Sequence, residues 1–197
     1  MMGRFWEPVM TSIKRCTWTG TDPLMIAYHD TEWGVPLHDD RKIYEFLVLE
    51  GMQAGLSWST ILRKRENFRA AFRGFDPAAV SNYGSREMDR LMADPGIIRN
   101  RVKLQAAINN AEKFLQVQKE FGSFDRYIWG FVGGKPIRHR FRKDSEIPAV
   151  SPESDRLSRD MKQRGFKFVG STIIYAHMQA TGMVNDHLAG CFRYSQV

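Results

Sequence analysis

The chain has 197 residues, of which 43% are hydrophobic and 26% are charged, so it is long enough to fill one core. No run of eighteen apolar residues occurs, which excludes a membrane-spanning helix, and residues 1–15 lack the apolar stretch of a secretory signal. The net charge of +7 is compatible with a nucleic-acid partner, and the two cysteines predict a reducing cytoplasm rather than a disulfide framework.

The predicted elements after the tail at residues 1–15 are all helices. Ile43, Phe46 and Leu47 follow the spacing i, i+3, i+4, which predicts an amphipathic helix over residues 40–50. Further helices are predicted at residues 57–72, 77–80, 85–96, 100–122, 123–132, 151–165 and 170–182. The polar, basic segment 133–148 shows no period and is predicted to be an exposed loop. Because no segment alternates like a strand, the sequence predicts an all-α fold.

Each of the two cysteines has a histidine nearby in the sequence. Cys16 precedes His29 by thirteen residues, and His187 and Cys191 are four apart, which would place them on one face of a short helix. Two thiolates and two imidazoles match a tetrahedral zinc site with no open position for water. Buried cysteines near unrelated histidines are the alternative. The double pairing favours a structural metal that joins the N-terminal segment to the C-terminal one.

Glu50 stands at position i+7 of the apolar stripe that begins at Ile43. An unpaired buried carboxylate is costly, so this side chain either faces a cavity or bonds backbone N–H groups at the helix end. Four aromatic residues are candidates for the same cavity: Trp18, Tyr28, Trp33 and Trp58. They are either core residues or, together with the carboxylate, a receptor for a flat cationic ring.

Two turns are candidates for contacts with a ligand. Gly55 and Leu56 follow the predicted helix of Glu50, and Leu56 is either packed or used as a wedge. A second turn, residues 165–170, joins two predicted helices, and its backbone N–H groups would suit a phosphate. Arg164 and Lys167 add positive charge there. An ordinary helical hairpin is the alternative.

Five segments, which lie in order between Cys16 and Cys191, resemble one family: DPLMIAYHDTEWGVP, LEGMQAGLSWSTILRKRENFR, GIIRNRVKLQAAINNA, RGFKFVGSTIIYAHMQATG and VNDHLAGC. This is the DNA-3-methyladenine glycosylase I family of the helix–hairpin–helix glycosylase superfamily. The resemblance implies an all-α helix–hairpin–helix DNA glycosylase fold. We expect one domain over residues 16–191, which could comprise two helical lobes, with tails at 1–15 and 192–197.

The resemblance also implies a structural zinc ion and a base-recognition pocket. The implied zinc ligands are Cys16, His29, His187 and Cys191. Glu50 would be the catalytic residue and would recognise the flipped base together with Tyr28. Trp58 would stack on this base, and Trp18 and Trp33 would complete the aromatic wall.

The implied partner is double-stranded alkylated DNA. Gly55 and Leu56 match the turn that the family inserts into the gap in the base stack, and the hairpin with Arg164, Lys167 and Gly170 would hold the backbone. The implied reaction hydrolyses an N-glycosidic bond, releases free 3-methyladenine and leaves an abasic site. We expect a monomer that binds no membrane.

Three positions bear on how far the resemblance extends. Met52 stands where the family pattern has Gln, and Met25 where an aromatic residue is common, so the lining of the pocket differs in detail. Asp186 is predicted to cap the helix that bears His187 rather than to activate water. The lysine of strand-cutting relatives is missing after the hairpin, which predicts no strand cleavage. The non-enzymatic alternative is a zinc-stapled helical module that binds DNA without catalysis.

Overall fold

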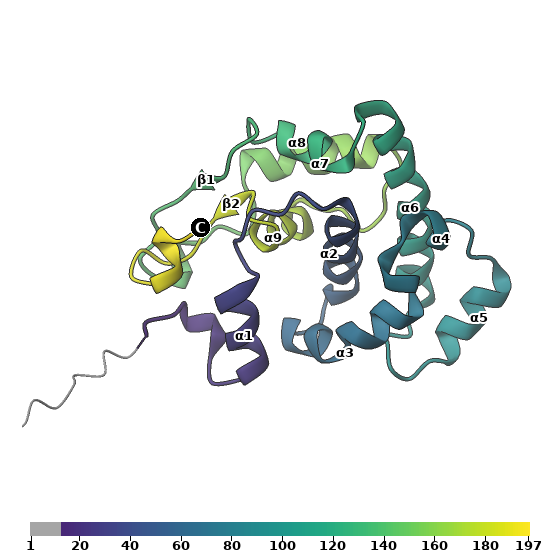
Figure 1. The fold of residues 1–197 in the computed structure, drawn as a ribbon, viewed down its shortest axis with the longest axis horizontal. Helices are drawn as coiled ribbons and strands as arrows, with labels where there is room; N and C mark the ends of the chain where they lie inside the picture. The colour runs from purple at the N-terminus through teal and green to yellow at the C-terminus, as the bar shows by residue number, and fades with distance from the viewer. Residues whose placement is uncertain (1–12) are drawn as a thin grey trace, which may run out of the picture.

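The computed structural model describes residues 13–197, so most of the tail predicted at residues 1–15 lies outside the described part. Figure 1 shows α2 in the middle, with α1 and the C-terminal segment on one side, α4 to α6 on the other and α3 below it. The helices are α1 Pro23–Thr31, α2 Asp40–Gln53, α3 Trp58–Ala71, α4 Pro77–Val80, α5 Ser85–Ala93, α6 Arg101–Phe121, α7 Phe124–Gly130, α8 Pro152–Gln163 and α9 Ser171–Ala180. Within residues 13–197, no helix is both long and apolar enough to cross a membrane.

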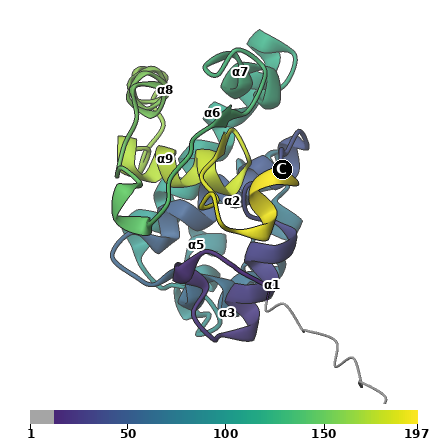
Figure 2. The same ribbon diagram turned by 90° about the vertical axis from the view of Figure 1, so that its left-hand side faces the viewer.

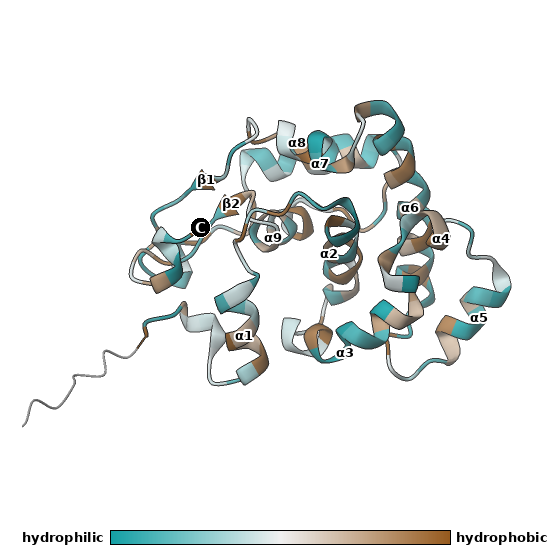
Figure 3. Ribbon diagram, in the orientation of Figure 1, coloured by the Kyte–Doolittle hydropathy of each residue, from teal (hydrophilic) through white to brown (hydrophobic). Residues whose placement is uncertain are grey.

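Helix α2 is the centre of the core. Every residue from Ile43 to Met52 is buried, because α2 contacts α3, α6, α7 and α9. Figure 3 shows the hydrophobic segments along α2, α6 and α9 that meet here. Such a helix buries its polar residues too. Glu45 is paired with Arg65 and Arg69 of α3, whereas Glu50, on the same helix, has no ion pair within the described residues.

Local sequence signals set most helix ends. Asp76 accepts a hydrogen bond from the Ala78 backbone N–H and precedes Pro77, as predicted for the start of α4. Gly122 ends α6 in the left-handed conformation, with φ of 85°. Helix α2 continues to Gln53, three residues past its predicted end, so Glu50 lies in its last turn.

The structure corrects the sequence prediction in three places. Helix α1 was not predicted, although Asp22 before Pro23 repeats the signal found at α4. Residues 186–191 form no helix, so the predicted helix with His187 and Cys191 on one face is wrong. A short parallel pair, β1 Ile137–Arg138 and β2 Val184–Asn185, interrupts the otherwise helical chain.

The two ends of the described chain lie side by side, as Figures 1 and 2 both show. The Phe192 backbone N–H donates to the Lys14 carbonyl, and Arg15 pairs with Asp30 at 2.7 Å. Residues 192–195 form a 3₁₀ turn, and the Asn185 amide donates to the Val197 carbonyl. The segments called tails in the sequence are therefore fastened to the domain from Lys14 onward and up to the last residue.

His177 of α9 is buried, and neither ring nitrogen has a hydrogen-bond partner among the described residues. Burial lowers its pKa from 6.5 to about 4, so the folded protein holds it neutral while the unfolded chain protonates below pH 6.5. Stability should therefore be lost as pH falls from 6.5 to 4, by about 3 kcal/mol from this residue. We expect His177→Phe to flatten this loss in denaturant titrations at several pH values. His38→Gln, at an exposed position, should leave the curve unchanged.

Candidate functional site

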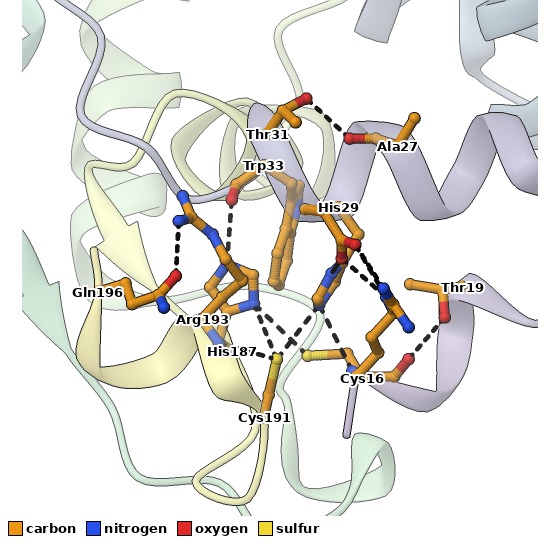
Figure 4. A network of polar contacts seen from close by, with 12 residues as sticks. Cys16, Thr19, Ala27, His29, Thr31, Trp33, His187, Cys191, Arg193 and Gln196 are labelled. Carbon is orange, nitrogen blue, oxygen red and sulfur yellow. Dashed lines mark hydrogen bonds and ion pairs between the residues drawn. The ribbon is translucent and has the colours of Figure 1, made fainter. Parts of the chain in front are cut away.

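Four side chains from the two ends of the chain meet in one buried cluster, shown in Figure 4. The cluster comprises Cys16, His29, His187 and Cys191, and their ligand atoms all lie within 4.8 Å of one another. The Cys191 Sγ is 3.4 Å from His29 Nε2 and 3.7 Å from His187 Nδ1, and the Cys16 Sγ is 3.6 Å from His187 Nδ1. The structure thus brings together all four predicted ligands.

Each histidine is oriented by a partner on its other ring nitrogen. The His29 Nδ1 is 2.7 Å from the Asp30 carboxylate, and the His187 Nε2 donates to the Trp33 carbonyl at 3.0 Å. These contacts leave His29 Nε2 and His187 Nδ1 as the nitrogens that face the sulfurs. Such outer contacts fix the tautomer of a metal-binding histidine. The sequence analysis did not find them.

The two buried cysteines can ionise only next to a positive charge, which a metal cation would supply. The Leu188 and Arg193 backbone N–H groups point at the sulfurs of Cys16 and Cys191, at 3.3 and 3.4 Å. Burial raises the pKa of the Cys16 thiol to about 12, so two thiolates need a bound positive charge to form here. Four protein ligands fill a tetrahedral site and leave no position for a substrate. A metal bound here would therefore be structural.

A cavity of about 480 Å³ opens next to the metal cluster. Its lining includes all five residues predicted for base recognition: Trp18, Tyr28, Trp33, Glu50 and Trp58. The aromatic rings contact one another, with centroids 5.1 Å apart for Trp18 and Trp33 and 5.5 Å apart for Tyr28 and Trp58. The predicted aromatic wall is therefore present as a continuous surface, wide enough for one planar ring system.

Glu50 is the acidic residue that α2 contributes to this cavity. Its side chain is buried, and it accepts no hydrogen bond from protein groups among the described residues, which rules out the backbone-capping alternative. Burial raises the pKa of the carboxyl from 4.5 to about 8. The same burial, followed by the nearby Glu50 carboxylate, raises the pKa of the Tyr28 hydroxyl. A strongly perturbed acid in an apolar cleft is typical of a functional group.

The turn between α2 and α3 lies at the edge of the cavity. Gly55 has φ of 80°, and Leu56 is 39% exposed, so the large aliphatic side chain is not packed in the core. The Gln53 amide donates to the Leu56 carbonyl at 2.8 Å, and the Leu56 N–H returns a bond to the Gln53 carbonyl. Gln53 and Trp58, which flank this turn, both line the cavity, so the turn holds Leu56 close to it.

The hairpin between α8 and α9 is hydrogen-bonded to α6. The Asn110 side chain accepts from the Lys167 N–H and donates to the Lys167 carbonyl, both at 2.8 Å. Lys167 is exposed, and Gly170 is the residue before α9. Arg164, by contrast, pairs with Asp160 at 2.6 Å and Glu120 at 2.7 Å. The hairpin therefore offers Lys167 to a ligand more readily than Arg164.

Asp186 does not cap a helix, contrary to the prediction. Its carboxylate is fully buried and accepts from Tyr175 at 2.7 Å, from Gln179 at 2.8 Å and from His139 at 2.6 Å. Three donors hold it as a structural anion between α9 and the segment before α8. Gln179 also lines the cavity, so the anchor fixes part of the pocket wall.

Sequence reasoning missed several residues of the cavity: Gln53, Asp144, Ile147, Ala176 and Gln179. Of the two methionines expected to alter the pocket lining, Met25 lines the cavity, whereas Met52 is buried in the core. Ala176 and Gln179 are three residues apart on α9, and residues at this spacing lie on the same face of a helix. Asp144 and Ile147 come from the segment predicted to be an exposed loop, and no local signal marks them as pocket residues.

Comparisons with known proteins agree with this geometry. A family model described as methyladenine glycosylase matches residues 18–194. The chain is 50% identical to DNA-3-methyladenine glycosylase 1 of Escherichia coli (strain K12) over 182 aligned residues. The aligned region covers 92% of this chain and 97% of that protein. A crystal structure of 3-methyladenine DNA glycosylase I superposes with a TM-score of 0.89 at 50% identity, over 91% of this chain and 98% of that one. The Staphylococcus aureus enzyme, whose structure addresses 3-methyladenine recognition, superposes with a TM-score of 0.88 at 38% identity, over 90% and 95% of the two chains. The chain therefore belongs to the methyladenine glycosylase family.

Proposed function

We propose that this protein is a DNA repair glycosylase that excises 3-methyladenine from alkylated DNA. The observation that carries the proposal is the buried, unbonded Glu50 carboxyl in an aromatic cavity. A protein that only binds DNA has no use for a buried acid with a pKa of about 8. The E. coli relative named DNA-3-methyladenine glycosylase 1 supports the same reaction.

Glu50 is the proposed catalytic residue because it would touch the base that leaves. Adenine methylated at N3 and still joined to its sugar carries a positive charge, which favours the ionised form of a nearby carboxyl. Glu50 would thus accept a hydrogen bond and balance the charge, with Tyr28 beside it. Trp58 would stack on the base, and Trp18 and Trp33 would close the wall.

The chemical demand on the protein is small. A cationic base is already a good leaving group, so no acid is needed to protonate it. The protein must extrude the nucleotide, at a cost of a few kcal/mol, and select the correct base. Water then attacks the sugar carbon, and the free base and an abasic site result. Asp186 is saturated by three donors and fully buried, so it takes no part in this attack.

We propose that the turn with Gly55 and Leu56 enters the gap left by the flipped nucleotide. The exposure of Leu56 and its place beside the cavity support this role. The hairpin, with Lys167 and the free N–H groups after Gly170, would contact the DNA backbone in a helix–hairpin–helix manner. Arg164 would brace the hairpin through its ion pairs rather than bind phosphate.

We propose zinc as the metal held by Cys16, His29, His187 and Cys191. Two thiolates and two imidazoles are the ligand set that tetrahedral zinc prefers, and the burial of all four supports a closed site. The ion would supply no chemistry to the reaction and would fasten both ends of the chain. We further propose that the protein is a cytoplasmic monomer with a single domain over residues 16–191. It would not cleave the DNA strand.

The function can be tested by incubating the protein with methylated duplex DNA and measuring released bases by chromatography. We expect free 3-methyladenine and an equal amount of abasic sites, with intact strands until the abasic sites are cleaved chemically. Binding to the duplex without base release would instead support the zinc-stapled binding module.

A further inference from the structure

Asp144 places a second carboxylate in the base cavity. It begins the 3₁₀ turn Asp144–Glu146 in the segment between α7 and α8, and it lines the cavity together with Ile147. The Thr17 hydroxyl donates to its Oδ2 atom. The Oδ1 atom is buried and has no hydrogen-bond partner among the described residues.

An unpartnered buried carboxylate oxygen is unusual in a folded protein. Leaving a buried acceptor unsatisfied costs about 1–3 kcal/mol, and more for a charged group. The cationic neighbours do not satisfy it: no ion pair joins Asp144 to Arg142 or Lys143 within residues 13–197, and the Arg142 N–H donates to Glu146 instead. Because Asp144 lines the cavity, a cation bound there would offset the charge that its own neighbours leave uncompensated.

The rest of the cavity indicates the charge of this partner. Its lining holds two carboxylates, Glu50 and Asp144, and no lysine, arginine or histidine. The indole rings of Trp18 and Trp58 also line the cavity, and their N–H groups have no partner among the described residues. Two acids within aromatic walls favour a cation over a neutral ring of the same shape.

We propose that Asp144 is a specificity-determining residue, which binds the extruded base on the side away from α2 and selects its positive charge. This inference rests on the proposed function, because the cation is the methylated base. Glu50 and Asp144 come from different elements, α2 and the turn before α8. Each can therefore contact a different edge of the ring, and together they reject uncharged adenine more strongly than Glu50 alone.

The test uses two small probes whose charge does not change with pH. The 3,9-dimethyladenine cation mimics the damaged base with its sugar bond, and 9-methyladenine is its neutral counterpart. We expect Asp144→Asn to weaken binding of the cation about three- to tenfold in calorimetry, because a charged hydrogen bond becomes a neutral one. Binding of 9-methyladenine should stay within twofold. Asp144→Ala should show the same selective loss.

Glu146→Gln is the matched control, because Glu146 belongs to the same turn, is exposed and does not line the cavity. It should change neither affinity, and none of the three variants should lower the melting temperature. Unchanged affinity for the cation in Asp144→Asn would overturn the proposal. Equal losses for both probes, or equal losses in Glu146→Gln, would assign Asp144 to the shape of the turn and overturn it too. A wild-type protein that prefers the cation but releases no base from methylated DNA would refute the glycosylase reaction alone.

Discussion

Replacing Glu50 with Gln is expected to weaken binding of free 3-methyladenine at least several-fold and, at the same time, to stabilise the free protein. The variant keeps the size of the side chain and one acceptor oxygen but cannot become the carboxylate that a bound cationic ring favours. Hydrogen bonds to charged groups contribute about 1.5–3 kcal/mol, against about 1 kcal/mol for neutral ones. Excision should fall as well, because recognition and bond breaking depend on the same contact.

The stability change follows from the sign of the pKa shift. Burial raises the pKa of Glu50 from 4.5 to about 8, so the folded protein must hold a proton that the unfolded chain releases above pH 4.5. This residue therefore destabilises the wild-type fold progressively as pH rises from 4.5 to 8, by up to about 1.4 kcal/mol per pH unit. Glu50→Gln should remove this dependence, which urea titrations at pH 5, 7 and 8 would measure.

Glu45 provides the matched control on the same helix. It is as buried as Glu50, but its carboxylate is paired with Arg65 at 2.6 Å and Arg69 at 2.9 Å. Glu45→Gln should therefore destabilise the fold and leave base affinity per folded molecule unchanged, the opposite of both effects at Glu50. If Glu50→Gln destabilised the protein and lost duplex and base binding alike, Glu50 would be a structural residue and the pocket would be wrongly placed.

The comparison of Glu45 with Glu50 also shows what sequence can and cannot predict here. The position i+7 from Ile43 correctly indicated that Glu50 is buried. The same reasoning placed no weight on Glu45, because its partners Arg65 and Arg69 are about twenty residues away. The predicted helix over residues 57–72 gave no sign that Arg65 is buried against Glu45 and Glu32. Pairing between helices is tertiary information that periodicity does not contain.

Residue chemistry proved a better guide than helix spacing at the metal cluster. The set of two cysteines and two histidines was correct, although the reason given for His187 and Cys191, a shared helix face, was wrong. Residues 184–193 form no α-helix because Val184 and Asn185 pair with β1 and the backbone N–H groups of Leu188 and Arg193 point at the sulfurs. Asp144 was missed for a similar reason. A polar loop in the sequence becomes a cavity wall only when the fold brings it beside Thr17 and Trp18 of the N-terminal segment.

Cys191→Ala is expected to cost about 3 kcal/mol or more of unfolding free energy and to abolish stoichiometric metal binding. The substitution removes one of four buried ligands and leaves His29 Nε2 without its sulfur neighbour. A metal held by the four ligands would join Cys16 to residues 187–191, so its loss would loosen both ends of the chain. Elemental analysis should give about one zinc per wild-type chain and much less in the variant.

Removing the metal from the wild type gives the independent check on the same energy. A strong chelator should lower the melting temperature of the wild type toward that of Cys191→Ala and should barely affect the variant, because the variant has no ion to lose. Base binding by the molecules that remain folded should fall less than stability does, since no metal ligand lines the cavity. A variant that stays as stable as the wild type but loses excision would show that the site is catalytic. The closed set of four ligands argues against this result, because it leaves the ion no position for water or substrate.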